Sequence, residues 1–163
     1  MLAYLCGCAD LSEDAGKLWR RKLIPFLRDQ LGHRVYDPAE LTTRSLTAEE
    51  AAQIRTWQTT DLDRFRRAAR KTIASNLDLV EHKADYLVCY WNPPGAAAGE
   101  AVAGVTAAHR KGIPVYLVAP VPAEEIDAWV LGCSDQVFTS VDDLKGFLAS
   151  RFSREKQTVL WKE

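Results

Sequence analysis

Three unbroken apolar runs are the strongest feature of the hydrophobic pattern. They cover Leu2 to Cys6, Tyr86 to Trp91 and Val115 to Val118, and weaker runs lie at Arg34 to Tyr36 and Gln136 to Thr139. Because apolar residues follow one another without alternation, the strong runs are typical of strands that are covered on both faces of a sheet. The pattern therefore predicts five strands.

Segments with a helical period lie between these strands. Apolar positions spaced mainly three or four residues apart form stripes from Trp19 to Leu31, from Leu62 to Val80 and from Leu144 to Leu148. Gly32 marks the end of the first helix, and Pro25 predicts that this helix is kinked or starts late. The polar segment 42–59 is expected to form a helical flap or a mobile insert. A further helix of small side chains is expected to begin at Gly99-Glu100 and to end at Gly112.

Strands that alternate with helices of this length are joined to parallel neighbours through right-handed crossovers. We therefore predict the α/β class, with a doubly wound, parallel five-stranded sheet and helices on both faces, as in flavodoxin-like and Rossmann-like folds. Residues 1–163 are expected to form a single domain. Ligands of such sheets bind beyond the carboxyl ends of the strands, which here are followed by residues 7–10, 37–40, 91–100 and 119–122.

Composition and charge narrow the class of partner. The 163 residues are 47% hydrophobic, as in a soluble globular domain, and 21 Lys and Arg face 22 Asp and Glu. The chain lacks the positive excess that nucleic-acid and membrane-surface binders need. Its four cysteines form no CxxC pair, and no apolar stretch has signal-peptide or membrane-spanning character. We expect a cytoplasmic protein that binds small molecules or protein partners, with no nucleic acid and no membrane.

Glu100 is the most informative candidate for chemistry. The strand that ends near Trp91 leads into Asn92-Pro93-Pro94-Gly95, small residues and then Gly99-Glu100. Glu100 thus falls in the first turn of a helix, where the helix dipole stabilises a carboxylate by ~0.3–1 kcal/mol. The small neighbours leave room for a ligand, so Glu100 suits the role of a nucleophile or of a ligand-binding carboxylate. The alternative is a solvent-exposed carboxylate with no ligand, because acidic residues are common in the first turn of helices.

Residues at the other strand ends carry weaker signals. Tyr4 is either a core aromatic residue or a hydroxyl presented to a ligand, and Trp91 either stacks on a base or packs at the rim. Gly7 begins a turn that matches neither GxGxxG nor GxxxxGK[ST], which disfavours a dinucleotide fold and a P-loop. Asp10 suits a helix cap. No GxSxG motif is present, and no His or Cys spacing predicts a metal site.

Basic residues near two helices offer phosphate contacts, although a solvated surface is the default for such runs. One run occupies residues 64–71, and a second group lies near the first helix: Lys17, Arg20 and Arg21. Contact with a phosphate by either group would indicate a nucleoside monophosphate as the substrate.

Four motifs, taken in their order, resemble the nucleoside 2-deoxyribosyltransferase superfamily: Tyr4-Leu5-Cys6-Gly7, the strand led by Asp85, the turn with Gly99-Glu100, and Gly112-Ile113-Pro114-Val115. The resemblance covers nearly the whole chain, including residues 35–38 and 129–133. It implies cleavage of the N-glycosidic bond of a nucleoside or nucleotide by a glutamate that attacks the anomeric carbon. Water or a second base then takes the sugar. It also implies that no cofactor or metal is needed and that the chain forms a homodimer or larger homo-oligomer.

Carried over to this sequence, the resemblance implies that Glu100 is the nucleophile and that Tyr4 orients it. The family's helix before the third strand carries an aspartate that binds and protonates the base. Either Asn76 or Asp78 takes that place: Asp78 suits catalysis because it can protonate, whereas Asn76 suits base recognition. We expect the following residues to bind the substrate: Gly7, Asp10, Asn76, Trp91, Asn92, Gly95 and Gly99.

One departure leaves an alternative open. Glu100 precedes Pro114 by fourteen residues, about one helical turn more than the family pattern, so that Gly104 falls at the expected nucleophile position. Either the helix has an extra turn and Glu100 is catalytic, which we favour, or the protein is a nucleotide-binding module without activity. A phosphoribohydrolase is a further alternative, because the segment 94–100 partly resembles its PGGxGTxxE signature.

Overall fold

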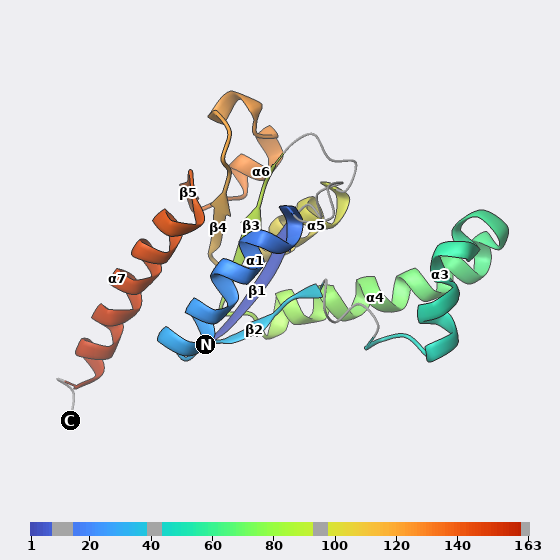
Figure 1. Ribbon diagram of the computed structural model, residues 1–163, viewed down its shortest axis with the longest axis horizontal. Helices are drawn as coiled ribbons and strands as arrows, with labels where there is room; N and C mark the ends of the chain where they lie inside the picture. The colour runs from blue at the N-terminus through green and yellow to red at the C-terminus, as the bar shows by residue number, and fades with distance from the viewer. Residues whose placement is uncertain (8–14, 39–43, 93–97, 161–163) are drawn as a thin grey trace.

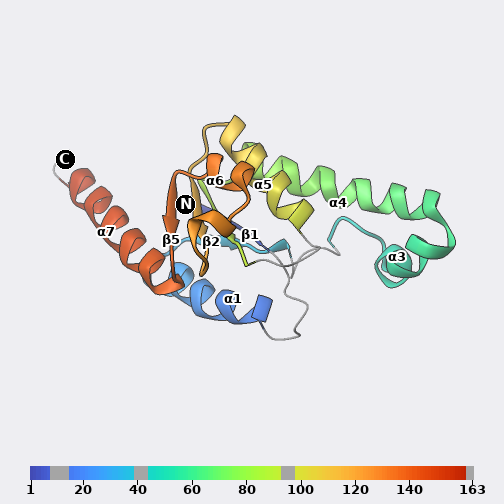
Figure 2. The same cartoon turned by 90° about the horizontal axis from the view of Figure 1, so that it is seen from above.

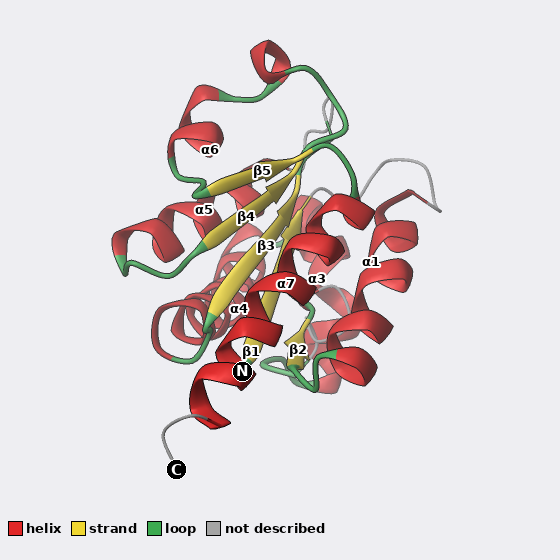
Figure 3. Ribbon diagram, turned by 90° about the vertical axis from the view of Figure 1, so that its left-hand side faces the viewer, coloured by secondary structure: helices red, strands yellow, loops and turns green. Residues whose placement is uncertain are grey.

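A five-stranded parallel sheet forms the centre of the molecule (Figure 3). The computed structural model describes residues 1–7, 15–38, 44–92 and 98–160 of the chain. The strand order is β2-β1-β3-β4-β5, and every neighbouring pair is parallel. This confirms the predicted sheet, whose strands are β1 (Leu2–Gly7), β2 (Arg34–Tyr36), β3 (Tyr86–Tyr90), β4 (Val115–Val118) and β5 (Gln136–Phe138).

Helices cover both faces of this sheet, as the view from above shows (Figure 2). One layer comprises α4 (Leu62–His82), α5 (Ala98–Arg110) and α6 (Ala128–Gly132). The opposite layer comprises α1 (Ala15–Pro25), the π-helical turn η1 (Phe26–Gln30) and α7 (Val141–Leu160). A short 3-10 turn, η2 (Ala123–Glu125), precedes α6. No helix in the described ranges is long and apolar enough to cross a membrane.

Successive side chains of β1 pack against different helix layers. Tyr4 and Cys6 belong to the buried cluster under α4, α5 and α6, whereas Ala3 and Leu5 belong to the cluster under α1 and α7. Successive side chains of a strand point to opposite faces, so a single strand supplies both cores. The tyrosine that the sequence singles out therefore faces α4 and α5.

Pro25 changes the first helix without ending it. Proline has no N–H to donate to the preceding turn. After it the chain continues as the wider π-helical turn η1, where the Leu31 N–H donates to the Phe26 carbonyl at 3.2 Å. Gly32 then adopts φ +70°, a left-handed conformation that ends the helix as predicted.

Two helices form a hairpin that projects from the body (Figure 1). They are α3 (Ala48–Thr60), which begins with a capping box between Thr47 and Glu50, and α4, which Asp61 caps. The helix expected within 42–59 is thus present from Ala48. However, α3 has no buried residue, and two members of the predicted 62–80 stripe are exposed, Leu62 at 48% and Ile73 at 56%.

Candidate functional site

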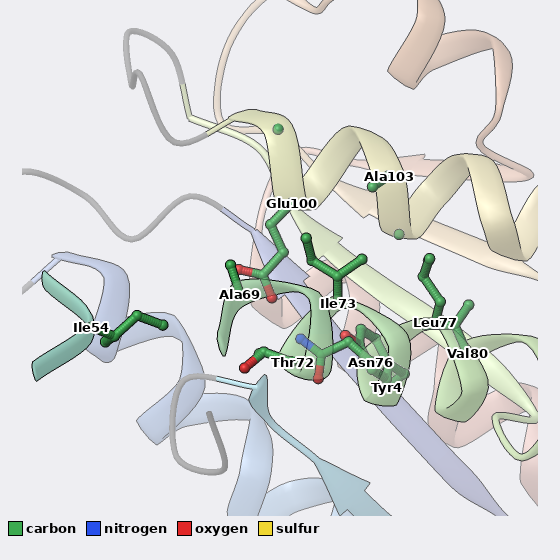
Figure 4. A pocket seen from close by; sticks show the side chains of 12 residues that line it. Tyr4, Ile54, Ala69, Thr72, Ile73, Asn76, Leu77, Val80, Glu100 and Ala103 are labelled. Atoms are coloured by element: carbon green, nitrogen blue, oxygen red, sulfur yellow. The ribbon is translucent and has the colours of Figure 1, made fainter. Parts of the chain in front are cut away.

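A cavity of about 420 Å³ lies between α4 and α5, on the face of the sheet that Tyr4 occupies (Figure 4). The order β2-β1-β3 makes the region beside β1 the topological switch point, where ligands of open α/β sheets bind. The helical hairpin closes the far side with Ile54 of α3, and α4 contributes Thr72 and Asn76. Most of the remaining lining is apolar, as is usual in small-molecule sites.

Glu100 stands in the first turn of α5 and points its carboxylate across the cavity toward α4 (Figure 4). Taken as a whole residue, Glu100 is exposed to solvent. Surrounding protein atoms nevertheless desolvate the carboxylate and raise its pKa above the usual range; Arg20 opposes this shift and Asp37 adds to it. The arrangement holds a carboxylate at the mouth of a largely apolar space.

Two glycines line the cavity together with the Glu100 carboxylate. Gly99 and Gly104 both line the cavity with Glu100, and a Cβ added at Gly104 would lie 3.5 Å from the Sγ atom of Cys6. The two alternative nucleophile positions, one helical turn apart, therefore face the same space. The carboxylate of Glu100, one turn before Gly104, thus still lies at the cavity.

Tyr4 forms part of the inner wall and is only 2% exposed. Its ring stacks on Tyr36, with the centroids 5.3 Å apart and the planes at 16°. Burial raises the pKa of the Tyr4 hydroxyl far above its usual range, and the charges of Cys6 and Glu100 add to the shift. Tyr4 thus stays protonated, although no hydrogen bond joins it to Glu100 in the described part of the chain.

Of the two residues on α4 that the sequence leaves open, the structure brings Asn76 to the cavity. The Tyr36 hydroxyl donates to Oδ1 of Asn76 at 3.2 Å, which fixes the amide. Asp78 is two residues further on and hence about 200° around the helix. Its exposed carboxylate pairs with His82 at 3.2 Å and Lys83 at 3.9 Å, so the geometry does not support Asp78 as the acid.

A buried ion pair between Arg20 and Asp37 influences the pKa of Glu100. The Nε atom of Arg20 on α1 lies 3.0 Å from Oδ1 of Asp37, which follows β2, and the two side chains are 11% and 2% exposed. The Arg20 charge lowers the pKa of Glu100, so the pair acts on the cavity electrostatically. The sequence offers Arg20 as a phosphate contact and marks Asp37 only as a strand end; nothing in the sequence joins them.

Other expected binding residues have different positions. Gly7 adopts φ +149°, and a Cβ there would lie 2.5 Å from the Tyr90 carbonyl oxygen, so this glycine permits close approach of β1 and β3. Trp91 is buried in the core beneath α5 and α6, which supports packing over base stacking. Gly7, Trp91 and Asn92 are not among the described residues that line the cavity. Asp10 and Gly95 lie outside the described residues.

The other residues that the sequence singles out form no metal site in the described ranges, and the basic run behaves as a solvated surface. No group of three His, Cys, Asp or Glu side chains there could hold a metal ion. On the basic run of the hairpin, Arg66 pairs with Asp63 at 3.6 Å and Lys71 with Glu50 at 2.6 Å, as on a solvated surface.

The fold and its cavity define the class: a doubly wound α/β protein with a carboxylate at the switch point of the sheet. Two solved structures share this fold. The 2-deoxyribosyltransferase of the psychrotolerant bacterium Bacillus psychrosaccharolyticus superimposes with a TM-score of 0.64 and 19% identity, over 89% of this chain and 90% of that one. A conserved protein from Enterococcus faecalis V583 gives 0.58 and 16%, over 93% and 99%. No family model and no curated sequence matches the chain.

Proposed function

We propose that the protein cleaves the N-glycosidic bond of a nucleoside or nucleotide, with Glu100 as the nucleophile. The observation that carries this proposal is the Glu100 carboxylate, which points into an apolar cavity beside Asn76 and Tyr4. The fold shared with a 2-deoxyribosyltransferase supports it. The volume of about 420 Å³ falls within the usual range for small-molecule sites.

The proposed reaction is a double displacement. One Glu100 oxygen bonds to the anomeric carbon while the bond from that carbon to the base nitrogen breaks, and its electron pair leaves with the base. Water or a second base then attacks the same carbon and releases the carboxylate. The transition states have oxocarbenium character, which a nearby carboxylate stabilises. The amide of Asn76 both donates and accepts hydrogen bonds, so it suits recognition of the base.

The proposal is tested by incubating the protein with ribo- and 2′-deoxyribonucleosides and their 5′-monophosphates, with and without an acceptor base. Chromatography then measures free base and exchanged nucleoside. Base release supports hydrolysis, and exchange supports transfer. Saturable binding by calorimetry with no base released would instead indicate the nucleotide-binding module and contradict the proposed chemistry.

The pH profile gives a second check on Glu100. Only the ionised carboxylate is a nucleophile, and burial raises its pKa above the usual range. We therefore expect kcat/KM to rise with pH through the acid range, with a midpoint above that of an exposed glutamate. Rates measured in overlapping buffers at constant ionic strength give the profile. A rate that falls as the pH rises through this range would contradict the assignment.

We further propose that the chain assembles as a homodimer or larger homo-oligomer through the α3–α4 hairpin. Helix α3 has no buried residue, and Leu62 and Ile73 expose apolar surface along α4. Helix α3 packs against α4 without burying any residue, and helices in proteins owe most of their stability to such packing. A second copy that covers this face would supply the missing contacts.

The expected effect of Leu62→Glu is a lower molecular mass, because a charge at this 48% exposed position disfavours the contact. Light scattering coupled to size-exclusion chromatography measures it. Leu18→Glu on α1, where the leucine is 55% exposed, is the control and should keep the wild-type mass. A wild-type protein that elutes as a monomer would contradict the assembly.

A cytoplasmic location also belongs to this proposal. Cys6, Cys89 and Cys133 are free thiols and are buried within the described residues. Free cysteines are typical of a reducing compartment.

A further inference from the structure

We propose that a second cavity, distinct from the one that Glu100 lines, binds an oligophosphate anion. This cavity has a volume of about 540 Å³ and lies at the β2 edge of the sheet, beside η1 and the C-terminal end of α4. Four cationic side chains from different parts of the chain line it: Arg28 of η1, Arg34 of β2, Arg44, and Lys83 just after α4. No sequence motif joins these residues, which the fold alone brings together.

The charge of this cavity is not balanced by its own walls. Among the described residues that line it, none is acidic. Lys83 has a carboxylate nearby, that of Asp78 at 3.9 Å, in a largely exposed pair. The three arginines form no ion pair within the described part of the chain. Like charges gathered without counter-charges produce a positive potential that favours a bound anion.

The kind of cation indicates the kind of anion. The planar guanidinium group presents paired N–H donors whose geometry matches the oxygens of a phosphate. The charges of the three arginines, with that of Lys83 partly offset by Asp78, exceed what one carboxylate can neutralise, and they suit a chain of two or three phosphates. The volume is also large enough for such a chain with an organic group attached. Leu79 and Val35 supply an apolar wall for that group.

Tyr36 separates the two cavities. It lines the second cavity, whereas its hydroxyl donates to Asn76, which lines the first. Glu100 is not among the residues of the second cavity. Binding of an anion there therefore does not depend on glycosidic chemistry, and the proposal stands apart from the function proposed above.

The test is calorimetric titration of the full chain, at low ionic strength, with inorganic tripolyphosphate and, in a second arm, with ATP. We expect saturable binding that weakens as salt rises, because salt screens the charges. Arg28→Glu and Arg34→Glu should each raise Kd by about ten-fold or more, since each removes one charged contact and adds a repulsive one. Where Arg28→Glu and Arg34→Glu weaken both ligands, tighter binding of ATP than of tripolyphosphate would identify a nucleotide-type ligand in this cavity, and the reverse order an inorganic chain. ATP binding that neither variant weakens would count against the site, because it would belong to the Glu100 cavity.

The control is Arg110→Glu, which makes the same charge change at an exposed arginine of α5 outside the second cavity. It should leave Kd for tripolyphosphate within about two-fold of wild type. Circular dichroism and melting curves establish that each variant is folded, and Arg44→Glu replaces any that is not. Absence of saturable binding, or equal weakening by Arg110→Glu and Arg34→Glu, would overturn the proposal.

Discussion

Replacement of Glu100 by glutamine is expected to abolish base release and to lower kcat by on the order of 10³-fold or more, because it removes the nucleophile. Glutamine keeps the shape of the side chain and its place in the first turn of α5, yet its amide cannot form the glycosyl ester. The nucleoside assay described above measures the effect. Turnover that persists in this variant would end the proposal for Glu100.

Two controls separate chemistry from folding. Glu49→Gln makes the same change at an exposed first-turn glutamate of α3 and should leave the rate unchanged. For Glu100, burial raises the pKa in the folded state, so between the unfolded and folded pKa values the native protein binds more protons, and its stability falls as pH rises. Glutamine removes that cost. The Glu100→Gln protein should therefore melt no lower than wild type at neutral pH, and a lower melting temperature would contradict this account.

Replacement of Arg20 by methionine is expected to lower the free energy of unfolding by roughly 3–5 kcal/mol. The change leaves the carboxylate of Asp37, which is 2% exposed, without the guanidinium 3.0 Å away. Methionine retains much of the aliphatic volume, so the loss of charge dominates. Urea denaturation followed by circular dichroism measures the effect.

The exposed pair of Arg66 and Asp63, at 3.6 Å, provides a matched comparison. Arg66→Met should cost less than about 1 kcal/mol, because solvent screens surface pairs. The double variant Arg20→Met with Asp37→Asn should recover part of the loss, since it also removes the buried charge. Equal destabilisation by Arg20→Met and Arg66→Met would contradict the importance of the buried pair. In an active protein, loss of Arg20 should also move the acid limb of the pH profile upward, because Arg20 lowers the pKa of Glu100.

Local pattern was sufficient to predict the fold. Unbroken apolar runs placed the three central strands to within a residue or two of their observed ends, because a strand covered on both faces leaves a continuous signal. The stripe from Leu62 to Val80 predicted a helix, and α4 confirms it. Periodicity identifies an apolar face but not what covers it. The exposure of Ile73 therefore could not be predicted from spacing.

Only part of the candidate site could be predicted from the sequence. Glu100 follows a strand end and begins a helix, which are local features, so the sequence could point to it. The choice between Asn76 and Asp78 depends on the rotation of α4 about its axis, which the distance to the next strand does not fix. The contact between Arg20 and Asp37 joins two elements whose relative placement only the folded sheet determines.

The hairpin has a consequence for how this cavity is built. Ile54 supplies part of its outer wall from α3, a helix with no buried residue, whereas Glu100 and Tyr4 belong to elements that pack in the sheet and its helix layer. The reactive group and this part of the wall are thus held by separate parts of the structure. Ligand preference can change through the outer wall while the reactive centre and the stability of the sheet stay as they are, so this wall is the place to begin redesign of selectivity.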